Sequence, residues 1–197
     1  ICVKGVEADD VIGTLTVAAS EIGIETLIAS GDKDLAQLVG DKVLLMDSMK
    51  DITYNAAGVV KKFGVPPERM VDYLTLVGDS VDNIPGVPKV GPKTASKWLN
   101  EFGSLDLLVR HADDIGGKVG ENLRAALDQL PMSKALATIK LDVQLDTYPD
   151  GLLVQPADKS RLRVLYADLE FKTWLSELGG LSGDYDKAKS QTVDYQV

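Results

Sequence analysis

The chain is poor in the side chains that build disulfides and zinc sites. Its 197 residues include one cysteine, Cys2, and one histidine, His111. A single cysteine excludes an internal disulfide framework and fits a reducing compartment. We expect Cys2 to be a small buried residue at the end of a strand. Because no cluster of histidines and cysteines is present, the sequence argues against a zinc hydrolase.

Long apolar runs are also missing. No stretch approaches the ~18 uncharged apolar residues that indicate a membrane span, and no secretory signal pattern opens the chain. We therefore expect no membrane partner and a cytoplasmic location. The net charge of −9 and pI near 4.6, taken alone, argue against a phosphate-binding surface. The 45% hydrophobic content is sufficient for the core of one domain or of two small ones.

Helix and strand patterns alternate over the first part of the chain. Residues 10–22 have apolar side chains at helical spacing, residues 25–30 and 42–47 are rich in strand formers, and residues 34–39 read as a helical turn. This order predicts a mostly parallel α/β sheet flanked by helices, in which ligands gather at the carboxyl ends of the strands. The opening letters ICVKG resemble the middle of a strand, so we expect the chain to be a piece of a longer protein.

Helical patterns replace strands after about residue 55. A possible extended segment covers residues 142–148, and from Gly179 the sequence loses its aliphatic residues and its period, which is typical of a linker. We therefore predict an α/β core at 1–55, a helical region at 56–178 and a linker at 179–197. The predicted helices cover 66–78, 92–102, 104–109 with Ser104 as N-cap, 121–130, 133–140, 158–169 and 171–178.

Carboxylates crowd together at three places where apolar segments end. Two unit charges of like sign ~4 Å apart repel by about 4 kcal/mol at an effective dielectric constant of ~20, so a convergent group needs a cation. An all-oxygen pocket suits Mg²⁺ or Mn²⁺. The three places are Glu7, Asp9 and Asp10 in GVEADDVIG, Asp32 and Asp34 in SGDKDL, and Asp79 and Asp82 in GDSVDN.

Each acidic group also has a purely structural interpretation. Asp34 precedes a helical turn and fits an N-cap or Asx-turn role. Glu7 and Asp10 suit the first turn of a helix, where acids complement the dipole. Asp113 and Asp114 follow no apolar strand, so we assign them to a solvated helix end.

The segment IPGVPKVGPKTASKWL predicts a hairpin followed by a helix. Gly86 and Gly91 flank the hairpin, and Pro92 can begin a helix whose first N–H groups are free to bind a phosphate. Lys93 and Lys97 share one helical face, and Lys89 lies in the hairpin. Together these features indicate a helix-hairpin-helix that grips the DNA backbone without reading bases. A plain helical turn with solvated lysines is the alternative. The predicted packed face contains Ala95, Trp98 and Leu99.

The motifs GVEADDVIG, SGDKDLAQLV and GDSVDNIPGVPKVGPKTA, in this order, closely resemble the 5′-nuclease domain at the amino end of bacterial DNA polymerase I. The resemblance covers residues 3–178. It implies a partial PIN/5′-nuclease-like α/β core followed by a helix-hairpin-helix (H3TH) region. It further implies a 5′–3′ exonuclease and flap endonuclease that uses two Mg²⁺ ions, or Mn²⁺, to remove RNA primers and displaced strands. Its partners are 5′-flap or nicked duplex DNA and RNA-primed strands.

The resemblance also assigns roles to residues. The three acidic groups match the family's acidic sites, and our hypothesis gives one ion to Glu7 and Asp9, with Asp10 acting through water, and a second to Asp32, Asp34 and Asp79, with Asp82 close by. The family's further aspartate and helical arch precede residue 1, which puts full activity in question, and Lys89 stands where the family commonly has glycine. We expect a monomer within a longer polymerase chain near the nucleoid. The DNA-binding set is Lys89, Gly91, Lys93, Thr94 and Lys97.

Three other functions remain open from the sequence. An RNA-cleaving nuclease on a similar sheet explains the carboxylates but not the hairpin. A phosphoacceptor signalling domain fits the first fifty residues and leaves the helical half unexplained. A catalytically incomplete fragment that acts only as a DNA-binding module explains the hairpin without requiring cleavage.

Overall fold

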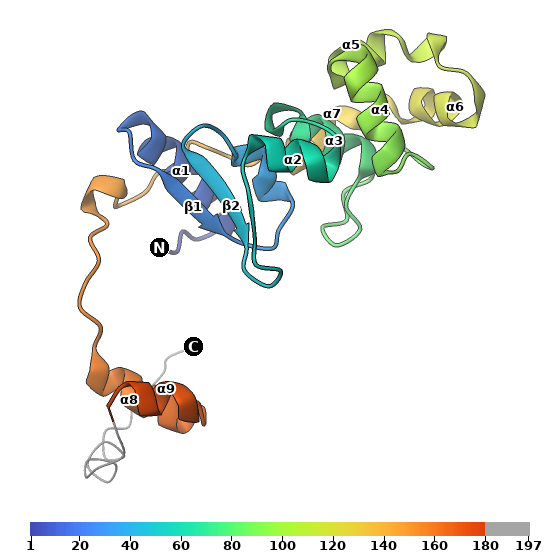
Figure 1. The fold of residues 1–197 in the computed structure, drawn as a ribbon. Helices are drawn as coiled ribbons and strands as arrows, with labels where there is room; N and C mark the ends of the chain where they lie inside the picture. Colours follow the sequence, from blue (N-terminus) through green and yellow to red (C-terminus); the bar gives the residue numbers. More distant parts are fainter. Residues whose placement is uncertain (180–197) are drawn as a thin grey trace. The chain divides into compact units, whose positions relative to one another are not determined.

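A small sheet lies at the amino-terminal end of the computed structural model, which describes residues 1–179 (Figure 1). Strands β1 (Thr26–Ala29) and β2 (Val43–Asp47) pair in parallel, with Ile28 opposite Leu45. Strand β3 (Ile52–Tyr54) pairs antiparallel with β2. The parallel pair confirms the prediction, whereas β3 was not anticipated because three residues are too few to show a strand period.

Helix α1 (Ala8–Glu21) is linked by hydrogen bonds to a segment far along the sequence. The Asp10 carboxylate accepts a hydrogen bond from the Lys140 backbone N–H at 2.8 Å, and the Thr14 hydroxyl accepts one from the Val143 N–H at 3.1 Å. A side chain at Gly13 would collide with Ile139, at 2.6 Å from its Cγ2. Residues 142–148, predicted as a possible extended segment, contain no strand.

The prediction for Cys2 was wrong. Residues 1–7 contain no strand, and the Cys2 side chain is exposed. In this segment the one turn-type backbone hydrogen bond joins Val6 N–H to the Val3 carbonyl. Without a paired neighbour the apolar letters ICV do not form a strand, so Cys2 lies outside the core.

Between Asn55 and Thr138 every regular element of the described chain is helical, and residues 78–91 form a loop and a hairpin. Local capping follows the predicted chemistry, because the Asn55 side chain accepts from Gly58 N–H at 2.9 Å and Ser104 Oγ accepts from Leu107 N–H at 3.2 Å. Asp113 and Asp114 are exposed at a short 3₁₀ turn, as expected. The helical elements are α2 (Ala56–Phe63), η2 (Pro67–Arg69), α3 (Met70–Val77), α4 (Pro92–Phe102), α5 (Leu105–Arg110), η3 (Ala112–Asp114), α6 (Gly117–Ala126) and α7 (Leu130–Ala137).

Helix α3 is the buried centre of this region. Met70 and Leu76 are fully buried on it, and the helix contacts α4, α7 and the 3₁₀ turn η1 (Asp34–Leu38), which lies between β1 and β2. The contact with η1 is important for the site, because η1 begins with an acidic residue and the loop after α3 contains two more. Tertiary packing of α3 therefore brings residues together that are more than forty positions apart in the sequence.

Residues 1–152, which end with the turn η4 (Pro149–Gly151), form one compact unit, and the described residues from 153 to 179 belong to another. In the second unit, α8 (Lys159–Asp168) and α9 (Lys172–Glu177) confirm the two predicted helices. Tyr166, Phe171 and Trp174 form an aromatic cluster between them. The predicted linker beyond Gly179 lies outside the described residues. Over residues 1–179 the structure contains no helix with the length and apolar character needed to cross a membrane.

Candidate metal centre and nucleic-acid interface

Three carboxylates from distant parts of the sequence meet at one point. Oxygen atoms of Asp34, Asp79 and Asp82 all lie within 4.8 Å of one another. Asp34 is the first residue of η1, and the other two belong to the loop that follows α3. Carboxylate oxygens at this spacing are the donor set that hard divalent cations take in proteins.

The loop with Asp79 and Asp82 is held by backbone contacts at its base. Asp79 and Ile84 exchange two backbone hydrogen bonds of 2.9 and 2.7 Å. Gly78 adopts φ 75° and ψ 175°, a conformation open essentially to glycine. A Cβ at Gly78 would lie 2.4 Å from the Gly86 backbone nitrogen, so the two glycines let the loop and the start of the hairpin cross in direct contact.

The Asp34 carboxylate is incompletely satisfied. Its Oδ1 is buried and has no hydrogen-bond partner. Burial raises the pKa of Asp34 to about 6, with Asp32, Asp79 and Asp82 adding repulsion and Lys33 opposing them. A buried oxygen without a partner is uncommon in folded proteins and requires an explanation. A bound cation is the simplest one for an oxygen surrounded by other carboxylates.

The N-cap role proposed for Asp34 belongs instead to its neighbours. Asp32 is exposed, and its Oδ1 accepts the Asp34 backbone N–H at 2.9 Å. Lys33 occupies the N-cap position of η1. The Asx-type turn is therefore made by Asp32, which leaves the Asp34 side chain free to face the cluster.

Lys33 is a residue of this site that sequence reasoning missed. Its ammonium donates a hydrogen bond of 2.5 Å to Asp79 Oδ2. This bond holds the pKa of Asp79 below its usual range. Local spacing gave no signal for this contact, because Asp79 lies 46 positions further along the chain.

The first acidic group lies in the electric field of the cluster without belonging to the group of three. Burial raises the pKa of Asp9, and the charges of Asp32, Glu7, Asp10 and Asp82 raise it further. Glu7 is exposed before α1 and makes no side-chain capping bond. Within the described chain, neither these residues nor Asp32 join the set whose oxygens fall within 4.8 Å. Their role as metal ligands stays a prediction.

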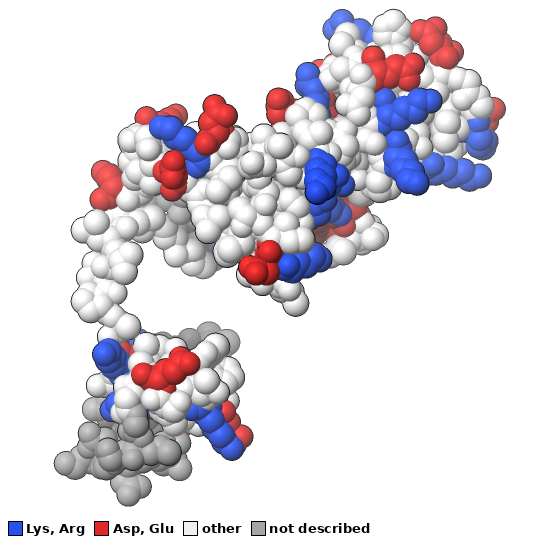
Figure 2. Space-filling model, in the orientation of Figure 1, with Lys and Arg blue, Asp and Glu red and all other residues white. Residues whose placement is uncertain are grey.

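The hairpin and α4 form an exposed basic surface. Helix α4 begins at Pro92 after the N-cap Gly91 and buries Ala95, Trp98 and Leu99, which confirms the predicted faces. Lys93 and Lys97 are exposed on it. Figure 2 shows lysine and arginine side chains over the surface that α4 and the end of α2 form. The remaining residues of the predicted DNA-binding set are Lys89, exposed in the hairpin, and Thr94, half-buried on α4.

Lys89 has an unfavourable backbone conformation. Its φ of 67° lies in the left-handed region, which costs an ordinary L-residue about 1–2 kcal/mol. The position is the one where the resemblance described above expects glycine. Among the described residues, Lys89, Lys93 and Lys97 form no ion pair with an acid of the chain. Their charges are therefore available to an external anion.

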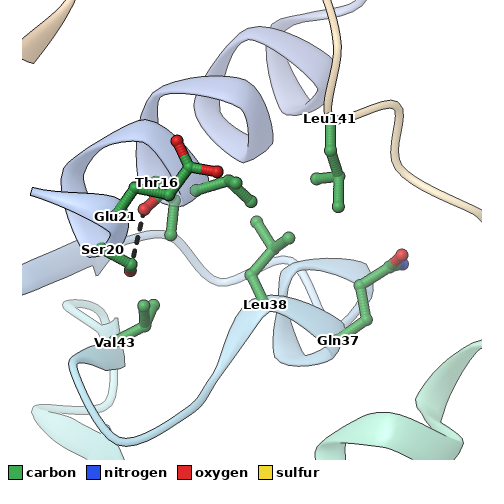
Figure 3. A pocket seen from close by; sticks show the side chains of 8 residues that line it. Thr16, Ser20, Glu21, Gln37, Leu38, Val43 and Leu141 are labelled. Atoms are coloured by element: carbon green, nitrogen blue, oxygen red, sulfur yellow. Dashed lines mark hydrogen bonds between the residues drawn. The ribbon is translucent and has the colours of Figure 1, made fainter.

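A separate hollow of about 420 Å³ lies between α1, η1 and β2 (Figure 3). Val17, Leu38, Val43 and Leu141 give it apolar walls. Its other lining residues are Thr16, Ser20, Glu21 and Gln37. None of the predicted site residues lines it, so the hollow is not the site of the acidic chemistry.

Family models match most of the chain in two consecutive parts. Residues 1–64 match the model described as 5′-3′ exonuclease, N-terminal resolvase-like domain. Residues 65–160 match the model described as 5′-3′ exonuclease, C-terminal SAM fold. The boundary between the two models falls between α2 and η2.

Curated relatives and solved structures agree with these matches. DNA polymerase I of Pseudomonas aeruginosa is 42% identical over all of this chain and 23% of its own length. DNA polymerase I of Bacillus subtilis is 42% identical over 93% of this chain and 22% of its own length. The chain thus spans about a fifth of these relatives.

Among solved structures, the zinc-bound T5 5′-exonuclease superposes with a TM-score of 0.66 at 24% identity, over 71% of this chain and 52% of its own. A complex of the bacteriophage T5 flap endonuclease with DNA and metal ions gives a TM-score of 0.65 at 24% identity, over 72% and 52% of the two chains. At this identity the likeness establishes the fold.

Proposed function

Because the chain belongs to the 5′-3′ exonuclease family, we propose that it hydrolyses phosphodiester bonds near the 5′ end of a DNA strand. The observation that supports this most is the meeting of Asp34, Asp79 and Asp82 within 4.8 Å. The loop that contributes Asp79 and Asp82 is in direct backbone contact with the start of the basic hairpin. The proposed substrates are 5′ flaps, nicked duplexes and RNA-primed strands.

The donor set fits Mg²⁺, with Mn²⁺ as an alternative. Every candidate ligand is a carboxylate, which hard cations prefer, and the buried Asp34 Oδ1 has no partner within the protein. Two bound divalent ions supply an activated water and neutralise charge on the phosphate. Glu7 and Asp9 would hold one ion, with Asp10 acting through water. Asp34 and Asp79 would hold the other, with Asp82 supported as a direct ligand by its distance and Asp32 placed beside them.

The remaining work of the protein is to hold the substrate. The exposed lysines Lys89, Lys93 and Lys97, with the backbone N–H of Lys93 after Gly91 and the Thr94 side chain, would bind backbone phosphates of the duplex. Because the Gly78–Gly86 contact joins the Asp79 loop to the hairpin, a duplex bound by the lysines is kept at a fixed distance from the carboxylates. Such positioning converts binding energy into rate.

A division of labour along the chain follows from this proposal. Residues 1–55 supply the α/β part of the metal centre, residues 56–178 the DNA grip and the Asp79 loop, and residues 179–197 a link to further chain. The relatives are much longer polymerases. We therefore place this chain, as a monomer, within a bacterial polymerase of the cytoplasm that acts on nucleoid DNA in replication and repair.

Cleavage of a labelled 5′-flap duplex, with Mg²⁺ and with EDTA, tests the function. We expect cleavage with Mg²⁺ alone, and we expect joint replacement of Asp32 and Asp34 by Asn to abolish cleavage in an otherwise active protein while DNA affinity is retained. Replacement of the solvated pair Asp113 and Asp114 by Asn is the matched control and should leave cleavage intact. Cleavage that survives the loss of Asp32 and Asp34 contradicts the site. DNA binding without any cleavage by the unaltered protein favours the alternative of a binding module.

A further inference from the structure

Lys33 occupies an unusual place among the carboxylates. It stands between Asp32 and Asp34 in the sequence, and its ammonium contacts Asp79 on another element at 2.5 Å. The Asp79 side chain is only 9% exposed, whereas that of Lys33 is 41% exposed. A lysine reaching from solvent thus binds a nearly buried member of the acidic cluster.

The other oxygen of Asp79 is already engaged. Oδ1 accepts the backbone N–H of Val81 at 2.7 Å and that of Asp82 at 3.4 Å, and Oδ2 accepts from Lys33. Both oxygens of Asp79 therefore have partners within the protein, in contrast to Asp34, whose Oδ1 has none. A divalent cation that takes both Asp34 and Asp79 must share Asp79 with the lysine or displace it.

We infer that Lys33 is an internal counter-ion of the acidic cluster: it holds the Asp79 carboxylate in place and exchanges with the divalent cation. The inference rests on the proposed function, since it assigns Lys33 a role toward the same metal centre. Lysine suits this exchange because its charge is compact and its stem is flexible. Its exposed side chain can withdraw into solvent when a doubly charged ion takes over Asp79.

The chain contains a matched ion pair of purely structural kind. Lys134 on α7 contacts Asp72 on α3 at 3.1 Å, with side-chain exposures of 38% and 7%. These values are close to those of Lys33 and Asp79, but Asp72 does not belong to the group of three carboxylates. Lys134→Met therefore removes a similar pair without touching the cluster.

The experiment compares the 197-residue chain with its Lys33→Met and Lys134→Met variants. Isothermal titration with MnCl₂ alone measures cation affinity, and melting in EDTA and in saturating Mn²⁺ measures stability. We expect Lys33→Met to bind Mn²⁺ about fivefold tighter, which corresponds to the roughly 1 kcal/mol of a partly exposed ion pair. Both variants should melt earlier in EDTA. In saturating Mn²⁺, Lys33→Met should melt at the same temperature as the unaltered chain, whereas Lys134→Met should still melt below it.

The outcomes separate this inference from the proposed metal centre. If the unaltered chain binds Mn²⁺ and Lys33→Met binds it equally or more weakly, Lys33 does not exchange with the cation and the inference is overturned alone. If Lys134→Met gains as much Mn²⁺ affinity as Lys33→Met, the gain comes from the loss of one positive charge anywhere in the protein, and the inference is again overturned. If none of the three proteins binds Mn²⁺ at millimolar concentration, the metal centre is contradicted and the inference is lost with it.

Discussion

Two carboxylates, Asp72, which is buried, and Asp34, which is half-buried, have opposite surroundings. Asp72 on α3 accepts the Leu105 backbone N–H at 3.1 Å, bonds Lys134 at 3.1 Å and has Arg69 at 3.9 Å. Asp34 lies among further acids and has a buried oxygen with no partner. Both side chains lie within the same packed unit, and the more buried of the two, Asp72, is the one whose carboxylate has partners.

The contrast separates carboxylates that hold the fold from those available to a ligand. Asp72 links α3, α5 and α7, and each of its bonds stabilises the junction. The Asp34 carboxylate has no such bonds, and its raised pKa means that the ionised carboxylate destabilises the folded state. Titratable groups with strongly shifted pKa values are concentrated at functional sites. Four substitutions test this contrast, beginning with the largest expected effect.

Gly78→Ala should be the most damaging of them. A Cβ at this position would lie 2.4 Å from Gly86 N, and φ 75° with ψ 175° is strained for alanine. We expect the free energy of unfolding to fall by about 4 kcal/mol, measured by urea denaturation. Gly40→Ala is the control, because no atom lies within 4 Å of a Cβ there. Equal losses in both variants would show that the crossing does not clamp the Asp79 loop.

Asp72→Ala should destabilise the protein by about 3 kcal/mol, because it leaves a buried N–H without a partner and breaks a nearly buried ion pair. Urea denaturation in EDTA measures the loss. Mn²⁺ affinity should not change, since Asp72 is outside the acidic cluster. A change in Mn²⁺ affinity of more than about threefold would show that Asp72 also influences the cation site, which contradicts its assignment as a purely structural carboxylate.

Asp34→Asn should raise the free energy of unfolding, whereas Asp72→Ala should lower it. The folded protein holds the Asp34 proton with a pKa of about 6 against an ordinary 3.8, so ionisation penalises the folded state above that pKa and not below 3.8. We expect Asp34→Asn to stabilise the protein by about 1 kcal/mol near pH 7.5 in EDTA, a value reduced for partial exposure. The gain should shrink as the pH falls toward about 4.

Urea denaturation across this pH range provides the measurement for Asp34→Asn. Asp113→Asn is a control, because that carboxyl is exposed on η3, and its substitution should change stability little at any pH. A loss of stability in Asp34→Asn near neutral pH would mean that Asp34 serves the fold as Asp72 does.

Lys89→Gly should have the smallest effect on stability, a gain of about 0.5 kcal/mol, because glycine accepts φ 67° without strain but costs more entropy on folding. The slope of the logarithm of DNA affinity against the logarithm of salt concentration should become shallower by about one, because one phosphate contact is lost. Asp51→Gly, at φ 54°, controls for the backbone effect. An unchanged salt dependence would exclude Lys89 from the DNA-binding set.

Local features of the structure were predictable, and long-range ones were only partly so. The Ser104 cap and the two faces of α4 follow from spacing within a few residues, and both are confirmed. The acids after β1 and after α3 were expected to meet, and Asp34, Asp79 and Asp82 do. The sequence could not show that Asp32 makes the turn, because Asp32 and Asp34 both suit either role.

Features that depend on a partner element were missed. β3 exists because β2 offers it a hydrogen-bonding edge, and Cys2 is exposed because residues 1–7 have none. The bond from Lys33 to Asp79 joins residues 46 positions apart and depends on the packing of α3 against η1. No spacing rule within a short segment contains such information.

Anomalous diffraction from crystals grown with MnCl₂ tests the central claim most directly. The account predicts a manganese peak coordinated by Asp34, Asp79 and Asp82, at about 2.0–2.2 Å from their oxygens. Loss of this peak is expected in Asp34→Asn and not in Lys134→Met. Manganese bound elsewhere, with these three carboxylates uncoordinated, would contradict the account.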